Sequence, residues 1–553
     1  MERFWSWCLT RPRLVLLALS LAALLPGLAT LPPLDRDESR YAQATKQMLE
    51  TGDFIEIRYQ DEARNKKPIG IYWLQAASVS ALTSPPYDQI WAYRLPSLGA
   101  ILLSALLVYA AGRALFTAEA AFIGAGLAAL TLIVIGEGHI AKTDAALLAC
   151  VLAAQSALAR AYLARNTAAR PWGDVLLFWG GLGLGILIKG PVGPFITGMT
   201  VLALIAWERR AAWLSSLRPL AGAVIAALIV LPWAIAIGIA TDGAFYRDAL
   251  LGDFGGKVTG EAERHGGVPG YYLMLTAATL WPGILFLLPT AIAASRARSE
   301  PAIRFLIAWA VPVWIIFELV PTKLPHYTMP LYPALTLAIG WALARAFARR
   351  DDWRALLSHR VSVVLYTLVG LTLASGPIVL TQLYGTPNLP LDIALTAMLA
   401  MAVLGTAAIA WRTRLRDALL CACGTALLIY AVLLQGLVPR LDALQLSPRA
   451  ASFVKEKGWD GSAPLTVSGY AEPSLVFLLG TQTRLLSGKE AARTLIADHQ
   501  GTALIADKEA GDFLRTLSEA GFRAEEQGTI AGFNYSRGDP VHLTLYRVLP
   551  PPH

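Results

Sequence analysis

Carboxylates suited to acid–base chemistry stand where the chain leaves a long apolar run. Asp35, Asp37 and Glu38 follow that run, and Arg40 and Tyr41 come three and four positions after Asp37. On a helix this spacing puts the side chains of Asp37, Arg40 and Tyr41 on one face. A helix N-terminus and a nearby arginine both favour an ionised carboxylate. The pattern predicts an Asp37 that is anionic at neutral pH, although carboxylates that only cap a surface helix would give the same spacing.

A second set of residues suits phosphate binding. The chain has eleven lysines, and five of them border apolar segments: Lys66, Lys67, Lys142, Lys189 and Lys323. A flexible ammonium at such a border can meet a phosphate at the depth of lipid headgroups. An arginine-rich composition combined with a lysine-tolerant exterior explains part of the same pattern.

Metal chemistry has weaker support. His139, His265 and His326 are scattered and lack the spacing of metal ligands. The four cysteines show neither a disulfide framework nor a zinc spacing. We therefore expect that no metal is required, while adventitious binding of a divalent metal remains possible at the histidines.

Membrane-spanning helices must position these groups. The 553 residues are 55% hydrophobic and 16% charged, with a mean hydropathy of +0.51, which excludes an ordinary soluble protein. Apolar runs of about 20 residues predict a mostly α, polytopic membrane protein. About thirteen spans are expected, starting near Arg13, Leu95, Thr117, Ala141, Asp174, Val192, Pro219, Gly270, Pro301, Tyr327, Val361, Pro390 and Asp417.

The orientation of the spans follows from arginines, which gather in alternate short loops. Positive charge marks the cytoplasmic side, so the N-terminus is predicted inside. Loops 32–92 and 241–268, and the chain after about residue 440, are then periplasmic. The inner arginines also explain the net charge of +8 without nucleic acid. The predicted span centres are uncharged, which disfavours an ion-coupled transporter. Polar residues are instead expected in the outer loops and at the outer ends of the spans, which favours an active site at the membrane surface.

The first outer loop is predicted to begin with a helix. Asp35 and Glu38 have the spacing of a capping box, and Tyr41, Ala44 and Met48 recur with helical periodicity. We expect an amphipathic helix lying on the outer surface.

The composition changes after residue 440. The segments "PLTVSGY", "RLLSGKEAARTLIADH", "TALIADKEAGDFLRTLSEAGF" and "VHLTLYRV" are typical of short strands alternating with amphipathic helices. They predict a transmembrane domain over residues 1–440 and a small soluble periplasmic α/β domain over 441–553. The segment "SGYAEPSLVFLLG" is expected only to pack. Acceptor binding and structural support both remain open as the role of this domain.

Four segments carry a resemblance to a known family: "RDESRYA" at 36–42, "KKPIGIYWL" at 66–74, "HIAKTDAALL" at 139–148 and "KLPHYTMPLYP" at 323–333. In this order the chain resembles the GT-C glycosyltransferases of the protein O-mannosyltransferase-like superfamily. Within it, the chain is most similar to bacterial lipid A 4-amino-4-deoxy-L-arabinose transferases. One departure is "KPIG", where many relatives have a second proline.

The resemblance implies a sugar donor linked to a polyprenyl phosphate, attacked with inversion on the periplasmic side. It assigns catalysis to an acidic residue just after the first span, here Asp37 with its neighbour Glu38. It also places an acidic residue at Asp144 in the pocket and a phosphate contact near His326 and Tyr327. Cations should stabilise the departing phosphate. The candidate donor-binding residues are Arg40, Tyr41, Lys66, Lys67, Arg264, Lys323 and Tyr327.

The expected function is transfer of 4-amino-4-deoxy-L-arabinose from undecaprenyl phosphate to lipid A phosphates in the bacterial inner membrane. This would give resistance to polymyxin and other cationic antimicrobial peptides. The expected partners are the lipid-linked donor, lipid A and membrane lipids, without nucleic acid. The alternatives are a protein O-mannosyltransferase or another transferase using a polyprenyl-phosphate sugar, and, from a different class, a non-catalytic flippase for lipid-linked sugars.

Overall fold

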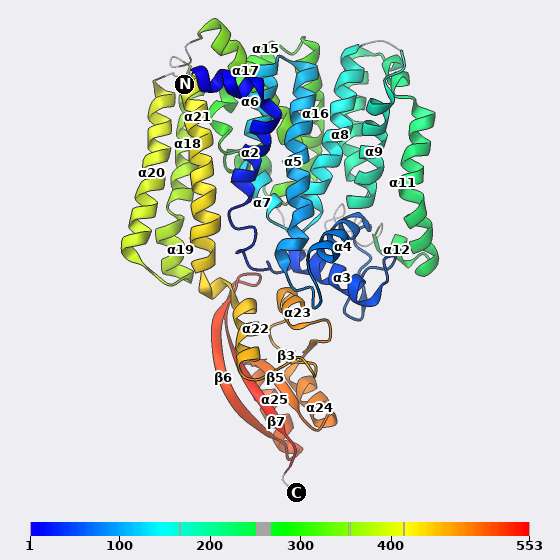
Figure 1. The fold of residues 1–553 in the computed structure, drawn as a ribbon, viewed down its shortest axis with the longest axis vertical. Coiled ribbons are helices and arrows are strands. Elements are labelled where there is room, and N and C mark those ends of the chain that lie inside the picture. The colour runs from blue at the N-terminus through cyan, green and yellow to red at the C-terminus, as the bar shows by residue number, and fades with distance from the viewer. Residues whose placement is uncertain are drawn as a thin grey trace.

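A bundle of long helices carries a smaller sheet domain at one end. The computed structural model describes residues 2–164, 168–249, 267–351, 353, 356–412 and 415–551. The N-terminus lies at the end of the bundle remote from the sheet domain (Figure 1). The end that carries the sheet domain is called the domain face below.

The bundle is built from helices that are long and apolar enough to cross a membrane. Among the described residues there are 9 of these, or up to 11 if each of two bent pairs makes one span. The single spans are α5 (Ile90–Leu115), α8 (Thr143–Ala164), α9 (Trp172–Lys189), α11 (Pro219–Ala240), α16 (Pro301–Leu319), α17 (Tyr332–Arg349) with the turn before it from Pro325, α18 with α19 (Leu357–Ala374 and Gly376–Tyr384), α20 (Leu389–Trp411) and α21 (Leu415–Ala431) with the turns after it to Arg440.

The bent pairs are α1 with α2 (Glu2–Thr10 and Pro12–Leu24) and α6 with α7 (Ala118–Leu130 and Leu132–Gly138). Two further apolar helices, α10 (Val192–Glu208) and α15 (Ile284–Arg296), have only 17 and 13 residues. Both correspond to predicted spans. The multi-pass architecture is confirmed, and the count of thirteen stays a prediction.

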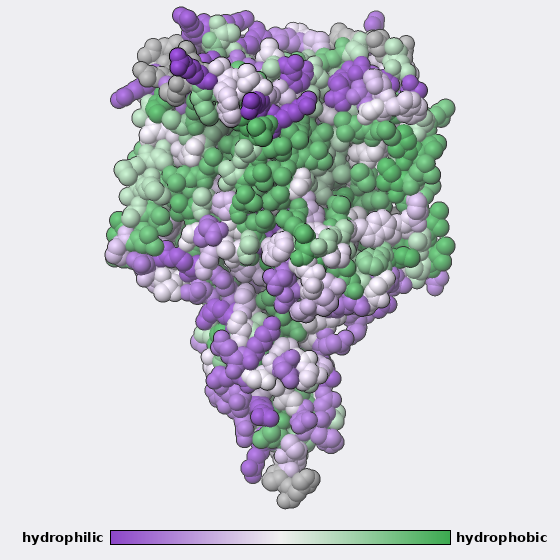
Figure 2. Space-filling model, in the orientation of Figure 1, coloured by the Kyte–Doolittle hydropathy of each residue, from purple (hydrophilic) through white to green (hydrophobic). Residues whose placement is uncertain are grey.

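On the face shown in Figure 2, apolar side chains form a broad band across the bundle, and polar side chains cover both of its ends and the sheet domain. On α11, Leu220, Leu228 and Ile239 are largely exposed. Such exposure is stable only where the surrounding medium is apolar, as in a bilayer.

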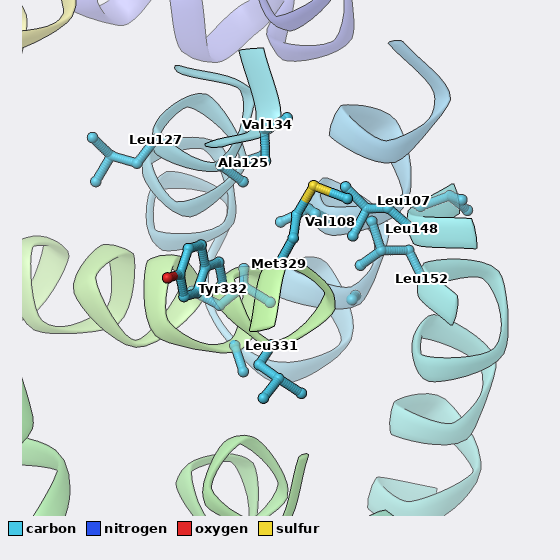
Figure 3. Packing of buried hydrophobic residues seen from close by; sticks show 14 of the residues in the cluster. Leu107, Val108, Ala125, Leu127, Val134, Leu148, Leu152, Met329, Leu331 and Tyr332 are labelled. Atoms are coloured by element: carbon cyan, nitrogen blue, oxygen red, sulfur yellow. The ribbon is translucent and has the colours of Figure 1, made fainter. Parts of the chain in front are cut away.

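Inside the bundle the helices pack through aliphatic side chains. Leu107, Val108, Leu148, Leu152 and Met329 meet between α5, α8 and the 3-10 turn η3 (Pro325–Leu331) (Figure 3). Small residues allow the closest approach: a Cβ at Gly340 of α17 would lie 2.2 Å from the carbonyl oxygen of Ala120 on α6. Close contact of this kind drives association of helices in membranes.

Short elements cover the domain face of the bundle. They are α3 (Asp37–Thr51), β1 (Arg58–Tyr59), β2 (Glu62–Ala63), α4 (Gly70–Leu82), α12 (Ala244–Arg247) and α14 (Tyr271–Thr279). The prediction that α3 lies on the outer surface is wrong: Tyr41, Ala44, Lys46 and Met48 are all buried. The helix α3 is enclosed because α4 covers one side and the sheet domain covers another (Figure 1). Residues 250–266, most of the second predicted outer loop, lie outside the described part of the chain.

The sheet domain begins with α22 (Leu446–Glu456) and contains a five-stranded mixed sheet in the order β4-β3-β5-β7-β6. Its strands are β3 (Thr466–Ser468), β4 (Arg484–Leu486), β5 (Gly501–Ala506), β6 (Arg523–Asn534) and β7 (Asp539–Leu549). Strands β3, β4 and β5 are parallel, and β7 pairs antiparallel with both β5 and β6. Its other helices are α23 (Pro473–Leu479), α24 (Gly488–Ala497) and α25 (Asp507–Glu519).

Candidate active site

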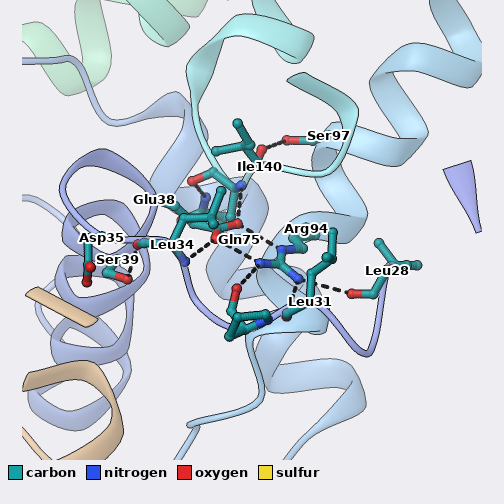
Figure 4. Close-up of polar contacts among 12 residues, drawn as sticks. Leu28, Leu31, Leu34, Asp35, Glu38, Ser39, Gln75, Arg94, Ser97 and Ile140 are labelled. Atoms are coloured by element: carbon teal, nitrogen blue, oxygen red, sulfur yellow. Dashed lines mark hydrogen bonds and ion pairs between the residues drawn. The ribbon is translucent and has the colours of Figure 1, made fainter. Parts of the chain in front are cut away.

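A buried ion pair lies at the centre of the domain face. Glu38 of α3 and Arg94 in the second turn of α5 are both 0% exposed at their side chains. Arg94 donates from Nε and Nη2 to the two carboxylate oxygens of Glu38, each at 2.8 Å (Figure 4). Its remaining hydrogens go to the carbonyl oxygens of Leu28, Leu31 and Pro32. The guanidinium is therefore fully bonded, which a charge at this depth requires.

The same ion pair fixes the turn that leads into α8. Glu38 Oε1 accepts a hydrogen bond from the backbone N–H of Ala141 at 2.9 Å. The Ala141 carbonyl accepts from Gln75 at 3.0 Å, and the Ile140 carbonyl accepts from Ser97 at 2.8 Å (Figure 4). The segment before α3, the N-terminal part of α5 and the turn at 140–142 are thus held together by one hydrogen-bond network.

This network replaces the predicted capping box. Arg36, and not Asp35, precedes the helix, with φ 62°, and no side chain caps it. Glu38 Oε2 accepts from the Leu34 backbone at 2.8 Å, while the Asp35 carboxylate accepts from Ser474 of the sheet domain. The capping prediction is wrong because both carboxylates have partners outside the helix.

A second group of charges lies beside this network and is called the charge cluster; it consists of Glu137, Lys142, Asp144, Lys189 and His326. Lys189 Nζ is 2.5 Å from Asp144 Oδ1, and Lys142 Nζ is 3.0 Å from Glu137 and 3.8 Å from Asp144. The His326 ring nitrogens lie 3.6 Å from Glu137 and 3.7 Å from Asp144. The Asp144 carboxylate is occupied by two lysines, so it suits holding these cations better than accepting a proton.

Asp37 lies within electrostatic range of the charge cluster. It is the first residue of α3 and its side chain is exposed, unlike that of Glu38. Burial lowers the pKa of Lys142, but the charges of Asp144 and Glu137 outweigh burial, and that of Asp37 adds to them, so the pKa is raised above its ordinary value. Lys142 therefore remains a cation at neutral pH. Exposed Asp37, within electrostatic range of such a cation, is the better placed of the acidic residues to reach a substrate.

The predicted phosphate-binding residues are only partly brought together. Tyr327 lies by the charge cluster, with Lys189 Nζ 5.9 Å from its ring centre. Lys323 is buried and donates to the Gly267 carbonyl at 3.1 Å, whereas Lys66 is exposed. Lys67 donates to the Lys66 carbonyl at 3.2 Å.

On α3 itself, Tyr41 is buried between Tyr72 and Arg64, with the Arg64 guanidinium 5.2 Å from the Tyr41 ring centre. Arg40 lies near Tyr59. Arg264 and His265, also predicted for the site, lie outside the described residues.

The histidines have other partners in the structure. Both ring nitrogens of His139 meet backbone carbonyls, those of Ile135 at 2.8 Å and Pro26 at 2.9 Å. His326 belongs to the charge cluster. In the described part of the chain, no three His, Cys, Asp or Glu side chains are grouped so as to hold a metal ion.

Sequence reasoning missed Arg94 and Arg64. The predicted second span begins near Leu95 and leaves Arg94 outside it, whereas α5 starts at Ile90 and includes Arg94. A signal was present: Arg94 stands between apolar residues on the side where lysine was expected to prevail. An arginine there suggests a fixed, multiply bonded partner, since its planar fork suits a buried carboxylate.

Comparison with known proteins agrees with this architecture. A family profile for dolichyl-phosphate-mannose-protein mannosyltransferase matches residues 8–242. The crystal structure of ArnT from Cupriavidus metallidurans in the apo state is similar over 97% of both chains, with a TM-score of 0.74 and 20% identity. The same protein bound to undecaprenyl phosphate gives a TM-score of 0.73, with 19% identity over 97% of both chains. The chain therefore has the fold of these ArnT structures.

Among curated relatives, the undecaprenyl phosphate-alpha-4-amino-4-deoxy-L-arabinose arabinosyl transferase of Erwinia tasmaniensis is 30% identical over 72% of each chain. That of Pseudomonas paraeruginosa is 30% identical over 57% of this chain and 56% of its own length. The chain thus matches little more than half the length of the Pseudomonas relative. The chain belongs to the family of undecaprenyl phosphate-aminoarabinose arabinosyl transferases.

Replacement of Arg94 tests the buried ion pair. Arg94→Met leaves Glu38 charged and unpaired in the interior, which typically costs about 3–5 kcal/mol of folding free energy. We expect a clear fall in the thermal unfolding midpoint of the detergent-purified protein. Arg304→Met breaks the pair with Glu208 at the other end of the bundle, where both side chains are partly exposed, and should cost much less. The double variant Glu38→Gln/Arg94→Met should recover part of the loss; equal losses in all three variants would refute the assignment.

Asp35 gives the junction with the sheet domain a pH dependence. Burial raises the pKa of Asp35 to about 6, the Ser474 hydrogen bond opposes this rise, and the charge of Glu472 adds to it. Because the pKa of Asp35 is higher in the folded protein than in the unfolded chain, where it is near 4, protonation of Asp35 stabilises the folded state at pH values below about 4. This stabilisation is lost as the pH rises through about 6. We expect the thermal unfolding midpoint of Asp35→Asn to increase relative to that of the unaltered protein as the pH rises from about 4 to about 6. A constant difference across this range would contradict the assignment.

Proposed function

We propose that this protein transfers 4-amino-4-deoxy-L-arabinose from undecaprenyl phosphate to lipid A phosphate groups on the periplasmic side of the bacterial inner membrane. The names of the family relatives support the donor and the sugar. The observation that carries the proposal is the buried cluster of Lys142, Asp144 and Lys189 on the domain face, whose charges are within electrostatic range of the exposed Asp37 carboxylate. A lipid-linked donor can present its phosphate and its sugar together only at a membrane surface.

The chemistry separates into two parts. Breaking the bond between the sugar and the lipid phosphate builds negative charge on the departing oxygen, which fixed cations stabilise without rearrangement. The candidates for this stabilisation are Lys66, Lys67, Lys189, Lys323 and Tyr327. Arg264 stays a candidate from the sequence alone.

Asp37 acts on the other side of the sugar. For an acceptor hydroxyl it would take the proton during attack. A lipid A phosphate is already largely ionised near neutral pH, since the second pKa of a phosphomonoester is about 6. With that acceptor, Asp37 would orient the phosphate, remove a residual proton or stabilise positive charge on the sugar ring. Attack from the face opposite the leaving phosphate gives inversion.

The proposed orientation rests on charge. Arg160 and Arg170 pair with Asp174, and Arg304 pairs with Glu208, at the end of the bundle remote from the sheet domain. Arginine-rich loops favour the cytoplasm. The domain face and the sheet domain would then be periplasmic.

A protein O-mannosyltransferase is the second candidate, because the mannosyltransferase profile matches residues 8–242. The two functions differ in sugar and acceptor, so one assay on lipid A separates them.

Mass spectrometry of lipid A tests the proposal. A strain lacking its own aminoarabinose transferase should gain the mass of one or more aminoarabinose groups when it expresses this chain. Asp37→Asn should reduce the modified fraction about a hundredfold or more, the usual effect of removing an acid–base group. Asp507→Asn is the matched control, because Asp507 is also exposed and begins a helix, α25. It should leave the modification intact.

The outcomes separate the claims. Modification by Asp37→Asn equal to that by the unaltered chain would remove Asp37 from catalysis. No modification by folded, unaltered protein with donor present would refute the lipid A acceptor and turn attention to protein acceptors.

We also propose that transfer needs no resident metal, because a donor with a single phosphate can be neutralised by lysines alone. Treatment of the purified enzyme with EDTA should leave the rate of transfer unchanged. A loss of activity that added Mg²⁺ or Zn²⁺ restores would contradict this proposal.

A further inference from the structure

The sheet domain contacts the start of α3 through Tyr535 and Ser536, in the turn between β6 and β7, and it contacts the length of α3 through α23 and the turn that follows it. The segment containing α23 is the one that the sequence predicted only to pack. It lies directly against α3 (Figure 1). Its contacts with the bundle are both apolar and polar, and they converge on the elements that carry the candidate site.

The apolar contact is made by Phe477. Its side chain is fully buried in a cluster that includes Ala42, Tyr93 and Ala141. Its ring packs edge-on against that of Tyr93, with 5.3 Å between the two ring centres. Ala42 lies on α3 with Asp37, Tyr93 precedes Arg94, and Ala141 precedes Lys142. One aromatic ring from the sheet domain therefore packs where three site-bearing elements meet.

Polar contacts secure the same segment along α3. Lys46 is buried and donates to the Phe477 carbonyl at 3.0 Å. Thr481 accepts from Gln43 at 2.7 Å and donates to Glu50 at 2.6 Å. These contacts follow one face of α3 for two turns, so they restrain both its position and its rotation.

From this geometry we infer that Phe477 is a positioning residue for sugar transfer, through which the sheet domain holds α3 and the turn at 140–142 in register. The inference rests on the proposed function and answers what the sheet domain does for it. Asp37 at the start of α3 must stay aligned with Lys142 and Asp144 beyond that turn. Displacement of a reacting group by 1 Å can lower a rate by about a hundredfold.

The test compares Phe477→Ala with Phe513→Ala. Phe513 is equally buried, but it lies in the core of the sheet domain between α25 and the sheet, away from α3. Both changes remove a buried ring from the same domain. For Phe477→Ala we expect kcat to fall on the order of tenfold to a hundredfold, with the KM for the lipid-linked donor little changed, because the phosphate-binding lysines are untouched. Phe513→Ala should lower thermal stability and leave kcat near that of the unaltered enzyme.

Conservative replacement gives the second comparison. Phe477→Leu keeps most of the apolar contact and should restore most of kcat; it also serves if Phe477→Ala does not fold. Equal losses of kcat at positions 477 and 513, or unchanged kcat in Phe477→Ala, would overturn the inference.

Hydrogen exchange of the backbone amides of α3 provides a readout without substrate. Exchange in α3 should accelerate in Phe477→Ala and stay unchanged in Phe513→Ala. Should the unaltered protein fail to transfer sugar to lipid A, the proposed function falls, and exchange alone then decides whether Phe477 holds α3. Unchanged exchange in Phe477→Ala would overturn the inference whatever the activity.

Discussion

The bonded pair of Glu38 and Arg94 is the interaction on which the domain face depends. Two opposite charges that are both excluded from water are stable only when every hydrogen and lone pair finds a partner. Here the partners are the carbonyls of Leu28, Leu31 and Pro32 and the backbone N–H groups of Leu34 and Ala141. Satisfying the pair therefore dictates the path of the chain as it leaves α2 and as it enters α8.

This constraint separates two neighbouring carboxylates by role. Glu38 is committed to the interior, and that commitment leaves Asp37, one residue earlier, on the exposed side of the first turn of α3. Adjacent residues at a helix start point about 100° apart, so burying one side chain turns its neighbour away. Glu38 thus fixes the backbone, and Asp37 is the carboxylate of the two that is accessible to a substrate. The catalytic roles predicted for both residues stay predictions.

The sequence predicted features that depend on composition or local pattern. Apolar runs located the bundle, and strand and helix periodicity located most of the sheet domain. Failures arose where long-range partners decide. Asp35 and Glu38 have the spacing of a helix cap, but their partners in the structure are Ser474 and Arg94. Strand β6 contains the charged residues Arg523, Glu525 and Glu526, so it lacks the apolar alternation that marks a half-buried strand. The burial of α3 was equally hidden, since its cover comes from residues more than 400 positions later.

The cover over α3 also explains why so polar a helix is tolerated in the interior. Gln43, Thr45 and Lys46 are buried, and each would be costly there without a partner. Gln43 donates to Thr481, Thr45 donates to Gln75, and Lys46 donates to the Phe477 carbonyl. Two of these three partners belong to the sheet domain, so Gln43 and Lys46 would lose these hydrogen bonds in a bundle without that domain. The polar composition of α3 thus matches a helix that both parts of the chain cover, the bundle through Gln75 and the sheet domain through Thr481 and Phe477.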